Sequence, residues 1–357
     1  MSMGLLRVCG DYRTTYSSDS RMFSDRYSFY IIVIGILLLL LSPFFLDQYL
    51  LSILIQIGFL GIAALGLNVL VGFTGQISIG HAAFFGFGAF ASVWINSSGI
   101  IPVWASIPLA GLMTASVGLI FGIPAARIKG LYLAIATLAA QFILEDFFAR
   151  ADWFTGGVVG AMAEPFTLFG FYLDTDESYF YVVLFWVIIS FVAVTNIMRT
   201  RSGRALIAVR DHYLSAEMMG INLTKYRIIS FGLSSFFAGL GGALYAHYLG
   251  FVSIEAFTIL FSIQFLAMII IGGLGSIRGS LMGAAFMVLL PEVMEYFVRL
   301  LSGSKIDEIF ALSSAIPFIK EMAIGLAIIL FLIFEPKGLS YRWGQIRAWF
   351  KLYPFSY

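Results

Sequence analysis

Charged residues are scarce in this chain. Only 11% of its 357 residues are Asp, Glu, Lys or Arg, whereas 60% are hydrophobic. Soluble globular domains carry roughly 25% charged residues, so the composition excludes that class. No charged residue occurs from Gln48 to Ala126. At about 20 residues per crossing, this stretch has room for three membrane spans with their turns, and a buried helix of a soluble domain would not explain its length.

Several chemical signatures are also missing. The single cysteine, Cys9, cannot form an internal disulfide and is expected to be a free thiol without function. There is no Walker motif, no zinc-ligand spacing and no nucleophile with an assignable base, so we expect no catalytic site. The glycine-rich segment IGGLGSIRG lacks the Gly-Lys-Ser/Thr of a phosphate loop and is expected to be a turn between membrane helices. The net charge of +1 does not indicate nucleic-acid binding.

The apolar runs predict an all-α polytopic membrane protein with about ten transmembrane helices. Residues 1–28 lack the basic-then-apolar shape of a cleaved signal peptide, so they are expected to form a cytoplasmic N-terminal segment. Residues 29–335 are expected to form the transmembrane domain, and residues 336–357 a cytoplasmic tail. The ten spans are expected to begin near Phe29, Leu50, His81, Pro102, Leu131, Tyr179, Tyr226, Phe257, Ser280 and Pro317.

The distribution of basic residues predicts the orientation. With both termini inside, all but four of the 21 Lys and Arg residues lie on the cytoplasmic side, as the positive-inside rule requires. Acidic residues are concentrated on the opposite side, above all in the loop that follows Phe148. If Leu65–Val93 were one helix rather than two spans that meet near Gly72–Gly80, this acidic loop would lie inside. The charge pattern therefore favours ten crossings.

One long polar segment, 199–227, interrupts the apolar runs on the expected cytoplasmic side. Ser202 can cap a helix that runs without proline from Gly203 to Met219, and Gly220 is a natural left-handed stop. At 1.5 Å per residue, this predicts one exposed helix about 25 Å long. Its apolar positions recur at helical spacing between charged faces. Such a helix is expected to lie on a surface or to dock onto a partner.

The segment Gly66–Phe90, GLNVLVGFTGQISIGHAAFFGFGAF, combines six glycines with polar side chains at membrane depth. Non-helical backbone there must be buried in protein or line an aqueous cavity, and broken helices hold substrate in many transporters. The alternative is that the glycines allow close packing and the polar groups bond across helices. Gln141 and Gln264 present the same choice. The candidate translocation path comprises Asn68, Thr74, Gln76, Ser78, His81, Gln141 and Gln264. His81 has no accompanying Cys or carboxylate, which argues against a metal site.

Two further patterns in the sequence concern helix packing and the energy source. Small residues spaced by four, Gly118 with Gly122 and Gly275 with Gly279 and Gly283, predict close helix packing. Acidic residues lie at span ends or in loops rather than at mid-span, where ion-coupled carriers often keep them. Energy for transport is therefore expected from another subunit, received through the segment 199–227.

Six segments resemble one protein family in order along nearly the whole chain. They are GLNVLVGFTGQISIGHAAFFGFGAF, RIKGLYLAIATLA, GRALIAVRDHYLSAEMMGIN, FFAGLGGALYAHYLGFVS, IIIGGLGSIRGSLMGA and FEPKGL. Together they resemble the LivM-type permease subunits of branched-chain amino-acid ABC importers. The resemblance implies a ten-helix, type II ABC importer-like permease fold, similar to that of the cobalamin importer.

The resemblance also implies an assembly. A LivH-type sister permease, two cytoplasmic ABC ATPases and a periplasmic or lipid-anchored binding protein would join this chain in the bacterial inner membrane. ATP and Mg would be used by the ATPases, and this chain would bind no cofactor. Ala216, Glu217 and Gly220 match the family's Ala-Glu-x-x-Gly coupling segment, and Arg204 and Arg210 match its basic positions. The departure is His212 and Tyr213, where relatives carry a more acidic stretch. The expected ATPase-coupling set is Gly203, Arg204, Arg210, Asp211, Ala216, Glu217 and Gly220.

The expected function is that of a non-catalytic subunit that moves leucine, isoleucine or valine inward. Related permeases handle urea or short amides, which is one alternative. A self-sufficient secondary amino-acid carrier or channel is a second, and a membrane-embedded enzyme built on Gln76 and His81 is a third. The sequence does not distinguish a permease heterodimer from a homodimer.

Overall fold

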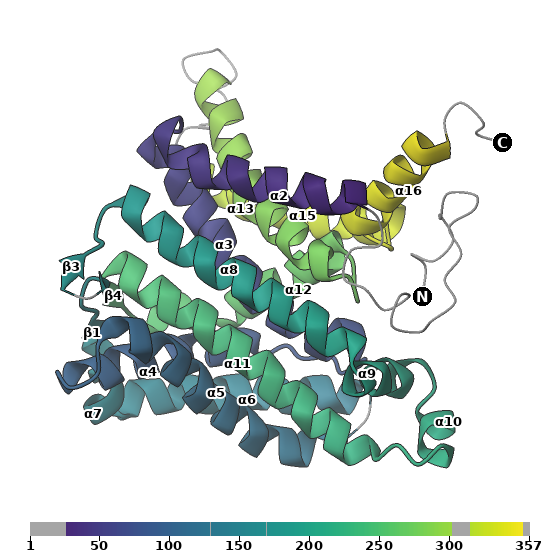
Figure 1. Ribbon diagram of the computed structural model, residues 1–357. Coiled ribbons are helices and arrows are strands. Elements are labelled where there is room, and N and C mark those ends of the chain that lie inside the picture. Colours follow the sequence, from purple (N-terminus) through teal and green to yellow (C-terminus); the bar gives the residue numbers. More distant parts are fainter. Residues whose placement is uncertain (1–25, 129, 169, 302–314, 353–357) are drawn as a thin grey trace.

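The computed structural model of the protein describes residues 26–128, 130–168, 170–301 and 315–352. Most of these residues are helical, as expected (Figure 1). Cys9, most of the expected segment 1–28 and the end of the tail, 353–357, lie outside the described residues. The long helices are α2 (Arg26–Leu41), α3 (Gln48–Asn68), α4 (His81–Ser97), α5 (Val103–Ala125), α6 (Leu131–Arg150), α8 (Asp176–Arg199), α11 (Leu223–Leu249), α12 (Ile259–Gly272), α13 (Ile277–Leu301), α15 (Ile316–Phe334) and α16 (Leu339–Leu352).

Shorter elements connect the long helices. They are the α-helices α7 (Asp152–Thr155), α9 (Arg201–Asp211) and α10 (Tyr213–Met218), the 3-10 helices η1 (Ser42–Phe44), η3 (Gly157–Val159) and η4 (Ile254–Phe257), and the π-helix η2 (Val69–Phe73). Four two-residue strands are β1 (Ala161–Met162), β2 (Thr167–Leu168), β3 (Phe171–Tyr172) and β4 (Phe251–Val252). β1 pairs antiparallel with β4, with Ala161 opposite Val252, and β2 pairs antiparallel with β3, with Thr167 opposite Tyr172.

A described helix begins within three residues of each of the ten expected span starts. Among the described residues, seven helical segments are long and apolar enough to cross a membrane: α3 with η2, α5, α6, α8, α11, α13 and α15. Two further apolar helices, Phe29–Phe44 and Ile259–Gly272, are shorter. The helix positions are confirmed, whereas the crossing of the membrane by ten helices stays a prediction.

The core of the bundle lies around α11, which packs against α3, α4 and α5. Within the most apolar stretch of each helix, 72% of the residues are buried in α11 and 78% in α3 with η2. In α15 only 6% are buried. Glycine permits the tightest of these crossings, because a Cβ on Gly88 of α4 would lie 2.2 Å from Gly239 Cα of α11. The expected packing role of the spaced glycines is also seen: Gly118 abuts Ser235, and Gly283 abuts the Met268 carbonyl.

The strands lie at one end of the bundle, and α9 and α10 lie at the other (Figure 1). At the strand end, a buried polar network ties the loop after α6 to the helices. Asn96 Nδ2 donates to Glu164 Oε2 at 2.8 Å, and His247 bridges the Glu164 carbonyl and Ser92 Oγ, at 2.8 Å each. Ser92 Oγ lies 3.0 Å from Ser106 Oγ. The side chain of His247 is buried, so the network fixes the loop on α4, α5 and α11.

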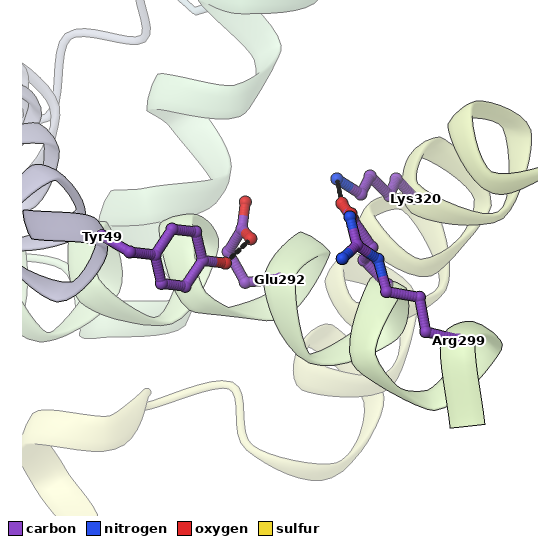
Figure 2. Close-up of polar contacts among 5 residues, drawn as sticks. Tyr49, Glu292, Arg299 and Lys320 are labelled. Carbon is purple, nitrogen blue, oxygen red and sulfur yellow. Dashed lines mark hydrogen bonds and ion pairs between the residues drawn. The ribbon is translucent and has the colours of Figure 1, made fainter. Parts of the chain in front are cut away.

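Polar contacts also join α13 to its neighbours (Figure 2). The Tyr49 hydroxyl at the start of α3 donates to Glu292, and the carboxylate of Glu295, one turn later, accepts from Arg299 and from Lys320 of α15. The side chains of Glu295 and Lys320 are only 22% and 26% exposed. Because a half-buried charge needs a partner, these acids hold the neighbouring helices in a fixed relationship.

Candidate functional site

The polar segment 199–227 folds into two helices rather than one. α9 begins after Thr200, whose hydroxyl accepts from the Gly203 N–H at 3.3 Å, so Thr200 and not Ser202 is the N-cap. The helix ends at Asp211, and His212, with φ −155° and ψ 82°, separates it from α10. The prediction of one continuous helix from Gly203 to Met219 is therefore wrong. Gly220 has φ +83° and ends α10, as expected.

The reason for the break is tertiary, because no glycine or proline lies at the bend. α9 is held against the bundle through its buried residues Ala205, Leu206 and Val209, and it packs on α8 and α11. His and Tyr are weaker helix formers than the Ala, Leu and Arg of α9. The helix therefore ends before His212, and α10 begins after it. Ala216 of α10 is buried, and its N–H donates to the His212 carbonyl at 3.0 Å.

The helix break expected near Gly72–Gly80 is present. α3 passes into the π-helix η2, the chain is non-helical from 74 to 80, and α4 begins at His81. Single π turns inside longer helices are frequent at functional sites. Gly72 lies against a second break, the turn between α12 and α13, and a Cβ on Gly72 would lie 2.4 Å from the Gly275 nitrogen. The break between α3 and α4 thus meets the turn between α12 and α13 at Gly72 and Gly275.

Asn68 joins the two breaks. Its Nδ2 donates to the Ser276 carbonyl at 2.8 Å and to Ser280 Oγ at 2.9 Å, and its Oδ1 accepts from Gly275 N at 2.9 Å. The side chain is fully buried. All of the amide's strong bonds are made within the protein, which favours the packing alternative for Asn68 over a place on the path.

Arg210 of α9 reaches the same junction. Its Nη1 donates to the Gly72 carbonyl at 2.6 Å, and its Nε donates to Asp211 Oδ1 at 2.8 Å. Gly75, with φ +73°, packs on the aliphatic part of this arginine. The structure therefore brings together two groups of residues that the sequence placed in separate segments.

Gln76 and Ser78 carry the unsatisfied polar atoms of the broken segment. Gln76 Nε2 donates to Ser230 Oγ at 2.6 Å and points to the Arg227 carbonyl at 3.4 Å. Within the described residues, neither Gln76 Oε1 nor Ser78 Oγ has a hydrogen-bond partner, although both atoms are buried. Thr74, by contrast, donates to the Val69 carbonyl at 3.0 Å. A buried acceptor without a donor costs free energy, so the two atoms mark a place where a polar ligand or water would be stabilised.

His81 and Gln141 lie deeper in the bundle. His81 Nε2 is 2.9 Å from the Ala63 carbonyl, and its ring packs edge-on against Phe265. Gln141 Oε1 accepts from Ala83 N and Ser262 Oγ, both at 3.0 Å, and its Nε2 donates to the Phe257 carbonyl and Glu145. The side-chain amide of Gln141 is satisfied by cross-helix bonds. Gln264 is partly buried, and no described residue hydrogen-bonds its amide.

Comparison with known proteins identifies the family. The family described as "Branched-chain amino acid transport system / permease component" matches residues 49–334. The chain belongs to this family. It is 31% identical over 248 residues to the high-affinity branched-chain amino acid permease protein LivM of Salmonella typhimurium and to that of Escherichia coli K12, covering 62% of this chain. It is 25% identical over 238 residues to the probable LivM of Methanocaldococcus jannaschii, covering 66% of this chain and 67% of that protein.

The chain spans 58% of the length of the two LivM proteins of Salmonella and Escherichia coli. No solved structure matches the permease. Family membership and the seven apolar helices together show a multi-pass protein of the bacterial inner membrane. Within the part of the chain that the structure describes, no group of His, Cys, Asp or Glu side chains could hold a metal ion.

The residues expected to contact an ATPase divide into an inner and an outer group. Gly203 and Ala216 are buried, and Gly203 lies directly against the backbone of Ile197 and Met198. Arg204, Glu217 and Gly220 are exposed. Two apolar side chains beside Glu217, Met218 at 88% and Met219 at 84%, are also exposed. α10 thus presents an apolar surface with a charged border at the end of the bundle opposite the strands.

Sequence reasoning missed most of the residues that complete the junction. Ser230 and Arg227 of α11 hold Gln76, and Ser276 and Ser280 hold Asn68. Ser276 Oγ also lies 2.6 Å from Ser340 Oγ of α16. The signal in the sequence is indirect: the glycine-rich segments that contain Gly275 and Gly338 both belong to the family resemblance, and they meet here because Gly338 abuts Gly273.

Proposed function

We propose that the permease is the non-catalytic membrane subunit of an ATP-driven ABC importer that moves branched-chain amino acids inward. Its partners are a LivH-type sister permease, two cytoplasmic ATPases that use ATP and Mg, and a periplasmic or lipid-anchored binding protein. The observation that carries this proposal is the exposed pair α9–α10, which is anchored on the bundle from within and presents Met218 and Met219 outward. An apolar patch with a charged border is typical of a protein interface.

The proposed topology has ten crossings with both termini in the cytoplasm. The cytoplasmic segment before the spans is 1–28, the transmembrane domain is 29–335 and the tail is 336–357. Two observations support this arrangement. α9, which carries Arg201, Arg204 and Arg210, lies with α10 at the end of the bundle opposite the strands, and the acidic loop after Phe148 lies at the strand end (Figure 1). Lys and Arg favour the cytoplasmic side.

The proposed path passes the broken segment between α3 and α4. At 1.5 Å per residue, the helical run Gln48–Phe73 is long enough to cross the whole bilayer, so Thr74, Gln76 and Ser78 belong to its cytoplasmic third. His81, Gln141 and Gln264 lie closer to the midplane. Gln76 Oε1 and Ser78 Oγ are the atoms best placed to meet a polar solute. The path is completed by the sister permease.

ATP supplies the energy through α9 and α10. Nucleotide can shift an equilibrium between inward and outward states only by its differential affinity for the two states, so the ATPase must contact an element that differs between them. The cytoplasmic helix pair is such an element. Most acidic residues lie at span ends or in loops, and the two acids within α13, Glu292 and Glu295, are paired with Tyr49, Arg299 and Lys320. This argues against the alternative of ion coupling.

Reconstitution tests the proposal. The permease, a LivH-type partner, the ATPases and the binding protein are co-expressed, purified and placed in vesicles, and uptake of labelled leucine is measured. We expect ATP-dependent uptake, with urea and acetamide as weaker competitors. Removal of 203–220, or the milder Met218→Asp, should prevent the ATPases from co-purifying. Uptake of leucine by this chain alone, driven by an ion gradient, would support a secondary carrier instead.

The path is tested with cysteine labelling, for which the chain offers a simple background. Cys9 is the only cysteine, so Cys9→Ser leaves no thiol. In that background Ser78→Cys should react with a small hydrophilic thiol reagent during transport, and leucine should slow the reaction. Ser106→Cys, also buried but on α5, where its hydroxyl donates to the Val103 carbonyl, is the control and should remain unreactive. Equal reactivity at both positions would contradict the proposed path.

A further inference from the structure

Arg210 points into the permease rather than away from it. Arg210 lies on the same exposed helix pair as Arg204 and Glu217, but its guanidinium turns toward the bundle. Its side chain is 33% exposed, and its Nη1 lies 2.6 Å from the Gly72 carbonyl. Asp211 holds the other edge of the guanidinium at 2.8 Å. An arginine that pairs along two edges is held in one orientation.

The Gly72 carbonyl needs this arginine because of the helix break. In an uninterrupted α-helix it would accept from the N–H four residues later. Here the Gln76 N–H donates to the Leu70 carbonyl and the Gly75 N–H to the Val71 carbonyl. The break thus removes the ordinary donor of Gly72, and Arg210 replaces it from a different helix.

The guanidinium also lies against the second break. Gly275 has φ +73°, and a Cβ at this position would lie 2.9 Å from Arg210 Nη1 and 3.1 Å from the Gly72 oxygen. The absence of a side chain on Gly75 and on Gly275 leaves the space that the arginine fills. Arg210 therefore contacts both interrupted helices at once.

From there the bonds continue into the bundle. Asn68, one turn before Gly72, binds Gly275, Ser276 and Ser280, and Ser276 binds Ser340 of α16. The segment that follows Gly75 carries Gln76 and Ser78, whose buried oxygen atoms lack partners. A displacement of α9 would pull on a carbonyl beside the proposed path, and that carbonyl has no helical donor to return to.

We propose that Arg210 is a positioning residue that transmits movement of α9–α10 to the two helix breaks, η2 and the turn between α12 and α13. This inference rests on the proposed function, because it assumes that the ATPases move the helix pair. The inference goes beyond the proposed function because it assigns Arg210 to the side of the segment that faces the membrane helices, while Glu217, Met218 and Met219 face the ATPase. Asp211 fixes the guanidinium, and Gly72 receives its hydrogen bond.

The test compares Arg210→Gln, Arg210→Lys and Arg201→Gln in the complete reconstituted complex. Arg201 is exposed at the start of α9 and serves as a control with the same loss of charge. Three quantities are measured: the amount of ATPase that co-purifies, the rate of ATP hydrolysis, and the leucine transported per ATP hydrolysed. For Arg210→Gln we expect normal co-purification, continued hydrolysis, and a ratio of leucine to ATP that falls at least ~5-fold, the lower end of typical coupling between sites.

Arg210→Lys should restore part of this ratio, because an ammonium can reach the Gly72 carbonyl but cannot bind Asp211 along a second edge. Arg201→Gln should keep the wild-type ratio. Loss of ATPase co-purification in both Arg210 variants would overturn the inference, since Arg210 would then face the ATPase. An unchanged ratio in Arg210→Gln would also overturn it. Failure of the wild-type chain to bind any ATPase would refute the proposed function itself, which separates the two outcomes.

Discussion

A hydrogen bond between Asn68 on α3 and Gly275 joins the end of α3 to the turn between α12 and α13. The Gly275 N–H donates to Asn68 Oδ1 at 2.9 Å, and the same side chain donates to the Ser276 carbonyl at 2.8 Å. The residues are 207 positions apart in the chain. This contact ties the two breaks together, because the turn between α12 and α13 satisfies its Gly275 N–H and its Ser276 carbonyl on the Asn68 side chain.

Replacement of Asn68 by Leu should destabilise the permease strongly. The change removes three bonds and leaves the Gly275 N–H and the Ser276 carbonyl partly buried without Asn68 as their partner. A fully buried group in that position costs ~1–3 kcal/mol. We expect a lower midpoint of thermal unfolding in detergent. Gln264→Leu is the matched control, because no described residue bonds the Gln264 amide, and its midpoint should stay near that of the wild type. Equal midpoints for the two variants would contradict this role of Asn68.

Substitution of Gly88 by Ala should disrupt the crossing of α4 and α11. The new Cβ would lie 2.2 Å from Gly239 Cα and 2.5 Å from the Gly239 carbonyl oxygen, and backbone cannot rotate away as a side chain can. Overpacking of this kind costs ~1–3 kcal/mol. Gly325→Ala on α15, where nothing lies within 4 Å, is the control and should be tolerated. The comparison is made by unfolding in denaturant, and similar stability of both variants would show that α4 and α11 separate easily.

His247→Phe should release the loop at the strand end of the bundle. Phenylalanine keeps the ring volume but loses the bonds to Ser92 Oγ and to the Glu164 carbonyl, so the loop loses its hydrogen bond to α11. The expected result is faster cleavage of residues 156–175 by a protease added on the outer side. His212→Phe changes an exposed histidine and should leave the cleavage rate unchanged. A loop equally resistant in both variants would show that the strands alone hold it.

Acid should loosen the attachment of α16 to the end of α15. The hydrogen bond from Arg342 lowers the pKa of Glu335 below its ordinary value of 4.5. A carboxylate with a lowered pKa stabilises the folded state above its unfolded pKa, and this contribution is lost as the pH falls through the lowered value. Hydrogen exchange in Leu339–Leu352 should therefore increase between about pH 5 and pH 3.

Glu335→Gln should remove this pH dependence, because the glutamine does not titrate. The Arg342 side chain is 56% exposed, so water screens the pair and the change in exchange is expected to be small. Arg342→Gln should give the same flat profile, since Glu335 then regains an ordinary pKa in both states. An acid-dependent increase that persists in both variants would assign it to other carboxylates.

The sequence by itself determined the class of the protein, the positions of its long helices and the places where they break. Within a bilayer, the backbone N–H and C=O groups of an apolar run of about 20 residues are satisfied by forming a helix. The helix starts near His81 and Leu131 could therefore be predicted directly. The break after Asn68 was visible because Gly72, Gly75 and Gly80 concentrate there with polar side chains. The stop at Gly220 followed from a local preference, since glycine adopts positive φ without strain.

The contacts of the helix breaks and of the segment 199–227 follow from the tertiary structure and not from the sequence. The tertiary structure divided the segment 199–227 at His212, where the backbone leaves the helical conformation and α10 begins, with Ala216 buried. It turned Arg210 inward to Gly72 and gave Asn68 partners 207 positions or more away. Hydrogen bonds across helices depend on which faces meet, and the helices here are apolar on nearly every side. The periodicity of their apolar residues therefore does not predict which helices contact each other, and only the packed structure shows these contacts.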